Sequence, residues 1–145
     1  MKILAMFFIF ALVMWNAGVG QVVSDFEGGD TDGWVSEGDG IYFREATTGN
    51  PGGCMRVNDD ATGDMNRAYA PVKFLGDWSG ADAFDTLSAD IFLNQIATAY
   101  ITSNFVFRII GPGGQATGIL NPKPPFQSWI TYKISLSSAD WQLNS

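Results

Sequence analysis

Short runs in which apolar and polar residues alternate recur through most of the chain, and clusters of glycine, proline and asparagine separate them. The alternation is clearest in 87–93, 104–110 and 129–136. Because successive side chains of a strand point to opposite faces, each run has one face suited to a core and one suited to solvent. A helical repeat of apolar residues is hard to find. The pattern therefore predicts an all-β protein built from antiparallel strands.

Weaker strand patterns occur elsewhere, and turn sequences lie between them. They cover 22–26, 41–46, 54–58, 67–70 and 115–120. The turn sequences include GNPGG at 49–53, GPGG at 111–114 and NPKPP at 121–125, where glycine permits positive φ and proline restricts φ. About eight short strands at this spacing predict an antiparallel β-sandwich of jelly-roll type, in one domain.

The first twenty residues have the order of features found in a secretory signal peptide. Lys2 supplies a positive charge, an apolar run extends to Trp15, and small residues end the segment at Gly20. We therefore expect residues 1–20 to be removed near Gly20, which leaves 21–145 as a secreted, extracellular domain. Glycine is a poorer residue than alanine at a cleavage site, so an uncleaved membrane anchor is the alternative. No second long apolar run follows.

Charge and composition exclude several classes of function. The formal net charge of −7 argues against a nucleic-acid or anionic-membrane partner, because both require a basic surface. Histidine is absent, which excludes Ser-His-Asp and Cys-His nucleophile systems. The single cysteine, Cys54, has no partner for a disulfide within the chain, and we expect it to be buried as a small apolar residue.

The segment 71–80, PVKFLGDWSG, is apolar but cannot continue a regular strand. Pro71 has no N–H to donate to a β-ladder, so it favours a strand end or an edge. We expect a loop or a single helical turn that covers one edge of the sandwich. The apolar residues that this segment is expected to bury are Val72, Phe74, Leu75 and Trp78.

Two parts of the sequence carry a family likeness. The run YAPVKFLGDWS, followed after a short linker by TLSADIFL, resembles the laminin B domain, also called laminin IV type A. The opening FEGGDTDGW resembles the first strand and turn of that family and of related galactose-binding-like sandwiches. The positions that match the family pattern are Tyr69, Ala70, Pro71, Lys73, Phe74, Leu75, Gly76, Asp77, Leu87, Ser88 and Asp90.

The resemblance implies a secreted β-sandwich module that binds or builds extracellular structures and does not catalyse a reaction. Its partner would be an extracellular protein or a polysaccharide. A carbohydrate-binding module accessory to an exported enzyme is the alternative. Members of the family continue past the segment that matches ISLSSADW with one or two strands. We therefore expect either closure with fewer strands or a sandwich that lacks its last strands within these residues.

Acidic residues are concentrated between positions 25 and 39, where no lysine or arginine occurs. Carboxylates in glycine-rich turns can surround calcium, which takes six to eight oxygen ligands with flexible geometry. We expect Glu27, Asp30 and Asp32 to be the ligands if a structural Ca²⁺ is bound. The alternative is that these acids are solvated turn residues, because D-x-[DN]-x-[DN]-G fits this segment only loosely and no closing glutamate follows.

Aromatic residues are abundant, and most are expected in the core because a domain without disulfides depends on buried apolar area. Trp34 and Trp78 lie in turn-rich segments, so they are the two aromatic residues that we least expect to be wholly buried, and they are the candidates for ligand contact. For catalysis only paired carboxylates are available, and no recognisable constellation places two of them together. We therefore expect no enzymatic activity.

Overall fold

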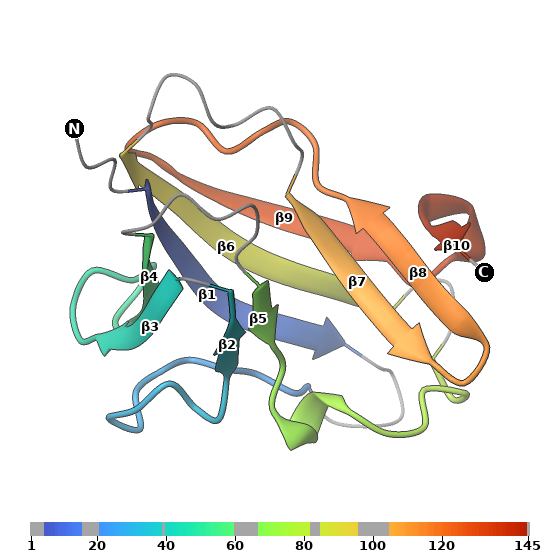
Figure 1. Cartoon of the computed structure of the whole chain (residues 1–145). Helices are drawn as coiled ribbons and strands as arrows, with labels where there is room; N and C mark the ends of the chain where they lie inside the picture. Colours follow the sequence, from blue (N-terminus) through green and yellow to red (C-terminus); the bar gives the residue numbers. More distant parts are fainter. Residues whose placement is uncertain are drawn as a thin grey trace.

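A computed structural model describes residues 5–15, 21–38, 40–59, 67–81, 85–95 and 105–144, with the backbone alone for 5–15, 59 and 95. These residues form strands and two short 3-10 turns (Figure 1). The strands are β1 (Ala5–Trp15), β2 (Val35–Glu37), β3 (Gly40–Glu45), β4 (Cys54–Asp59), β5 (Arg67–Tyr69), β6 (Thr86–Gln95), β7 (Val106–Gly111), β8 (Gly114–Ile119), β9 (Trp129–Ser135) and β10 (Gln142–Asn144). The 3-10 turns are η1 (Val72–Phe74) and η2 (Ser138–Asp140).

The largest sheet has five strands in the order β3-β4-β1-β6-β9, and every neighbouring pair is antiparallel. A three-stranded sheet, β10-β8-β7, lies across β6 and β9 in Figure 1. The ribbon of β2 and β5 lies over the other end of the large sheet. The all-β fold expected from the alternation is therefore confirmed, and the layers are sandwich-like.

The core lies between these layers. The main cluster contains residues from the large sheet, from the loop before β2 and from η1, and β7 and β8 pack against it. Gly118 in β8 permits close packing, because an added Cβ would lie 2.4 Å from Ile134 Cδ1 in β9 and 3.2 Å from the Trp141 ring. Cys54 is fully buried, as expected, and burial raises the pKa of its thiol.

Most of the predicted strands are present with the predicted faces. In β7, Phe107 and Ile109 are half-buried while Val106, Arg108 and Ile110 are exposed. The prediction of a strand over 22–26 is wrong, since only an isolated bridge occurs there. The backbone of Phe26 has φ 57°, which is incompatible with an extended strand. The short strands β2 and β10 were not expected.

The segment after Pro71 forms the single turn that the sequence indicated, but two of the burial predictions are wrong. Phe74 is buried, whereas Val72 and Leu75 are 82% and 65% exposed. A 3-10 turn has three residues per turn, so positions 72 and 75 lie on one side and position 74 on another. Only one side of so short a turn can face the core.

Residues 5–15 form the central strand of the large sheet, between β4 and β6. Removal of a leader near Gly20 stays a prediction, and the junction at 16–20 lies outside the described residues. In the part of the chain that the structure describes, no helix has the length and apolar character to cross a membrane.

Candidate functional site

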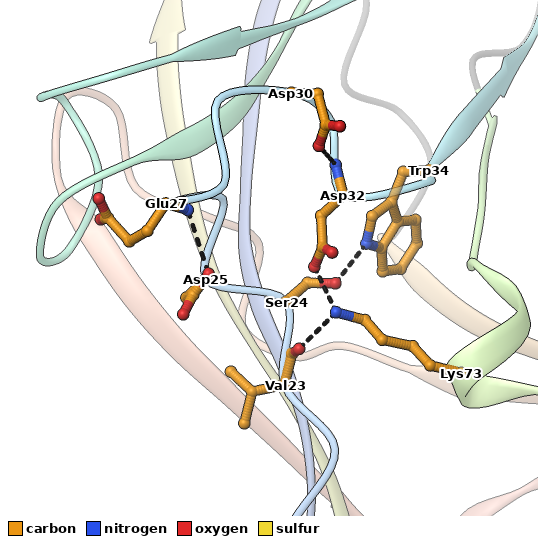
Figure 2. Close-up of polar contacts among 8 residues, drawn as sticks. All are labelled: Val23, Ser24, Asp25, Glu27, Asp30, Asp32, Trp34 and Lys73. Carbon is orange, nitrogen blue, oxygen red and sulfur yellow. Dashed lines mark hydrogen bonds and ion pairs between the residues drawn. The ribbon is translucent and has the colours of Figure 1, made fainter.

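Two segments that are far apart in the sequence meet at Lys73, the middle residue of η1. Its ammonium group donates a hydrogen bond to the carbonyl of Val23 at 2.6 Å and forms an ion pair with the carboxylate of Asp32 (Figure 2). Asp32 belongs to the opening FEGGDTDGW, and Lys73 belongs to YAPVKFLGDWS. We call Val23, Ser24, Asp32, Trp34 and Lys73 the Lys73 junction.

The junction continues into the core through Ser24, which is fully buried. The indole N–H of Trp34 donates to Ser24 Oγ at 2.8 Å, as Figure 2 shows. Burial is the largest single influence on the pKa of Asp32 and raises it. Hydrogen bonds from Lys73 and Ser24, together with the positive charge of Lys73, outweigh burial, so the pKa lies below its ordinary value. The junction thus holds Asp32 ionised.

A tight turn places Asp32 and Trp34. The backbone N–H of Asp32 donates to Asp30 Oδ1 at 2.7 Å, and the N–H of Trp34 donates to the carbonyl of Thr31 at 3.0 Å. Asp32 and Gly33 both have positive φ, a conformation that aspartate tolerates and glycine adopts freely. The sequence DTDGW therefore has the residue types that this turn requires.

The turn that contains Asp32 and Gly33 also packs closely against Pro71 and η1. A Cβ on Gly33 would lie 3.0 Å from Pro71 Cβ, so glycine lets the two segments approach. The Trp34 and Phe74 rings pack with their centroids 5.9 Å apart. The polar groups of the Lys73 junction bond to one another, which suits a structural tie between two loops.

Glu27 serves a second loop, away from Asp32. Its Oε1 accepts a hydrogen bond from the backbone N–H of Gly53 at 2.7 Å, and its Oε2 lies 3.9 Å from Arg44 Nη2. Gly52 has positive φ, and a Cβ there would meet Glu27 Oε1 at 2.0 Å. The carboxylate of Glu27 therefore bonds the GNPGG turn, 49–53, to the loop that contains Glu27.

The three carboxylates expected to bind calcium are thus engaged in different contacts. Asp30 accepts from a backbone N–H in its own turn, Asp32 pairs with Lys73, and Glu27 bonds to Gly53 and faces Arg44. Among the described residues, no three acidic, histidine or cysteine side chains form a group that could hold a metal ion. A Ca²⁺ bound by these residues would have to displace a lysine and a backbone N–H.

The two tryptophans proposed as ligand contacts lie in different surroundings. Trp34 is 8% exposed, so the expectation that it would be among the least buried aromatics is wrong. The reason is that its turn folds onto η1 and buries the ring against Phe74. Trp78 is half-buried, with its indole N–H donating to the carbonyl of Phe74 at 3.1 Å. Of the two, Trp78 keeps a surface that a ligand could reach.

Four exposed apolar side chains, not expected from the sequence, occur on the β2–β5 ribbon and in the segment 72–75 that follows it. Val35 and Tyr69 are directly paired across the ribbon, and both are exposed. Val72 and Leu75 follow within the same short stretch of chain. We call these four residues the ribbon patch. Sequence periodicity could not find the patch, because it depends on which side of a three-residue strand and of η1 faces solvent.

At the edge of this patch, Tyr69 and Arg67 both bond to Glu37. The phenol of Tyr69 donates to Glu37 Oε2 at 2.6 Å, and Arg67 forms an ion pair with the same carboxylate. The hydrogen bond from Tyr69 is the largest influence on the pKa of Glu37 and, with Arg67, lowers it. These contacts join β2 to β5 and hold the Tyr69 side chain in one orientation.

Comparison with known proteins finds no family model that matches the chain, no matching curated protein and no matching solved structure.

Proposed function

We propose that this protein is a secreted, non-catalytic β-sandwich module of the laminin B type, which acts in extracellular adhesion or assembly by binding another extracellular protein. The observation that carries the proposal is the ribbon patch. Its four apolar side chains, Val35, Tyr69, Val72 and Leu75, are exposed within or beside the segment that carries the family likeness.

Exposed apolar side chains that gather in one region, with polar residues at the edge, are characteristic of protein interaction sites. Glu37 and Arg67 supply such a polar edge here. The net charge of −7 favours a protein partner over a nucleic acid. Val72 is 82% exposed, and it is not among the residues of the main core cluster.

The Lys73 junction supports the same proposal. In this junction the lysine and the aspartate of the family-like segments join two loops, so both side chains have a structural role. The four apolar side chains of the ribbon patch have no part in this junction and are exposed. A module of this type would present a rigid surface, because loops held by buried hydrogen bonds lose little further freedom on binding.

The test is to measure binding of the exported protein to purified matrix proteins and to itself, by surface-immobilised binding and by sedimentation velocity. The double variant V72D/L75D places two charges on the ribbon patch, and we expect it to lose binding while its melting temperature is unchanged. I110D is the matched control, because Ile110 is 68% exposed on β7, outside the patch. Equal binding by the native protein and V72D/L75D would overturn the proposal.

A carbohydrate-binding module is the second candidate, and the partly accessible ring of Trp78 is the observation that favours it. Retention on insoluble polysaccharide that is lost in W78A and kept in V72D/L75D would support this candidate instead. N-terminal sequencing of the exported protein tests the predicted cleavage near Gly20.

A further inference from the structure

A cleft of about 400 Å³ follows the outer edge of β9, and we call it the β9 cleft. Pockets that bind small ligands have volumes of about 300–1,000 Å³. Six successive residues of β9, 130–135, line the cleft, and residues 119–122 and Asp140 complete the lining. Successive side chains of a strand point to opposite faces, so only a cleft along the edge of the strand touches all six. β9 is the last strand of the five-stranded sheet, next to β6 (Figure 1).

The backbone groups of Thr131 and Lys133 are directed into this cleft. The N–H of Leu136, just after β9, donates to the carbonyl of Asp85, just before β6. Bonded and non-bonded pairs alternate along an antiparallel ladder, so every second residue of β9 back from Leu136 also bonds to β6. The peptide groups of Thr131 and Lys133 lie between those residues and therefore face away from β6. Among the described residues, nothing bonds to these N–H and C=O groups.

The open part of this edge is short. The carbonyl of Ser135 already accepts the indole N–H of Trp141 at 2.8 Å, and the hydroxyl of Ser135 bonds to Asp140. The edge thus offers two backbone donors and two backbone acceptors, on Thr131 and Lys133. An extended peptide that pairs antiparallel with β9 can form two hydrogen bonds with each of these residues.

The side chains around the edge differ between its two faces. On one face the buried side chain of Tyr132 lies beside Ile119, which is 39% exposed, and Leu120, which is buried. On the other face Thr131 and Lys133 are exposed. In the part of the chain that the structure describes, the ammonium group of Lys133 has no hydrogen-bond or ion-pair partner. A lysine on an edge strand disfavours strands that have no acid to place opposite it.

We propose that the β9 cleft binds an extended, acidic segment of a partner protein as an additional antiparallel strand. The partner residue opposite Lys133 is an aspartate or glutamate, because directly paired side chains lie on the same face. The next partner residue, opposite Tyr132, is apolar and contacts Ile119 and Leu120. The third, opposite Thr131, is threonine or another β-branched residue. The partner segment therefore reads acid, apolar, β-branched in its own direction.

This inference goes beyond the proposed function, because the β9 cleft shares no residue with the ribbon patch. In strand addition the main-chain hydrogen bonds supply affinity, and alternate side chains supply specificity. At this edge the charge of Lys133 is the specific element, since it favours an acid and repels a base.

The experiment measures binding of a fluorescent, capped hexapeptide, Ser-Thr-Glu-Val-Thr-Ser, to the full chain by fluorescence anisotropy. Physiological ionic strength screens the net charge of the protein. Two N-methylated peptides are a matched pair. The N–H of the glutamate points to Lys133, whereas the N–H of the following valine points away from β9. We expect methylation of the glutamate nitrogen to weaken binding about tenfold and methylation of the valine nitrogen to change it by less than about twofold.

A charge exchange tests the side-chain contact. K133E should prefer a peptide with lysine in place of glutamate, which reverses the preference of the native protein. R108E is the matched control, because Arg108 is exposed on β7 and does not line the cleft. It makes the same change in net charge and should keep the native preference.

Absence of peptide binding, equal binding by the two N-methylated peptides, or an unchanged preference in K133E would each overturn the proposal. A dimer of the native protein in sedimentation velocity that K133E abolishes would also overturn it, since the edge would then pair with a second copy of this chain. V72D/L75D should bind the hexapeptide as the native protein does. Failure of this proposal is therefore distinguishable from failure of the ribbon-patch proposal.

Discussion

Lys73 is bonded to Asp32 across 41 positions of sequence, and this ion pair joins the loop before β2 to the turn after β5. The same ammonium group also holds the carbonyl of Val23. The lysine of YAPVKFLGDWS and the acidic turn of FEGGDTDGW therefore share one structural task. This contact explains why two motifs that are far apart in the sequence belong to one domain.

Replacing Lys73 with methionine should destabilise the protein by about 1 kcal/mol, because the pair is partly exposed and screened by solvent while the bond to Val23 is also lost. Urea unfolding at neutral pH measures this change. K133M is the control, since Lys133 is an exposed lysine on β9. Equal losses in the two variants would contradict the role assigned to the junction.

The contribution of Asp32 to stability should depend on pH. Its pKa is lower in the folded protein than its ordinary value of about 3.9, so the folded state binds its proton less readily. The stabilisation is therefore complete above that value and is lost as the pH falls through the folded pKa. We expect the difference in unfolding free energy between the native protein and K73M to shrink below about pH 4. A difference that stays constant to pH 2 would contradict the assignment.

The hydrogen bond between Trp34 and Ser24 can be tested by a double-mutant cycle. W34F leaves the buried hydroxyl of Ser24 without its donor and should cost about 2 kcal/mol of unfolding free energy. S24A should also destabilise, because the indole N–H loses its acceptor. If the two groups act through one bond, the double variant will cost less than the sum. Strict additivity would show that the bond contributes nothing beyond packing.

Alanine at Gly118 should disturb the contact between β8 and β9. The added methyl group would lie 2.4 Å from Ile134 Cδ1, so the strands must separate or the isoleucine must change rotamer. We expect a loss of about 1–3 kcal/mol in urea unfolding. G113A is the matched control, because nothing lies within 4 Å of a Cβ at Gly113, and it should change stability by less than about 0.5 kcal/mol.

Calcium should leave the melting temperature unchanged. Glu27 already accepts from Gly53, and Asp32 already pairs with Lys73, so a cation must displace both partners before it can bind. Thermal unfolding followed by circular dichroism, with calcium and then with a chelator, measures the effect. An upward shift with calcium would instead establish a metal site in the native state, and E27Q should then abolish that shift.

Several features could be predicted from the sequence because they depend on local chemistry. Alternation in 87–93 and 129–136 specifies which face of β6 and β9 is buried, since side chains in a strand alternate. Pro71 ends β5 because it has no N–H for the ladder. The likeness to the laminin B domain stays a prediction, as do the extracellular location and the partner.

Burial within turns could not be predicted in the same way. Hydrophobicity placed Val72 and Leu75 in the core, and a turn-rich context placed Trp34 near the surface. The structure reverses all three. A residue in a turn is buried or exposed according to the segment that folds against it. For Trp34 that segment is η1, which is distant in sequence and contributes Phe74.

The sequence by itself therefore determined the secondary-structure class, the main strands and the positions of the turns, because backbone preference and side-chain alternation act over a few residues. Only the tertiary structure decided that Lys73 pairs with Asp32, that Glu27 bonds to Gly53 and that residues 5–15 lie between β4 and β6. Each of these contacts joins residues that are far apart in the chain. No local pattern encodes such a pairing, because it depends on how complete sheets and loops pack against one another.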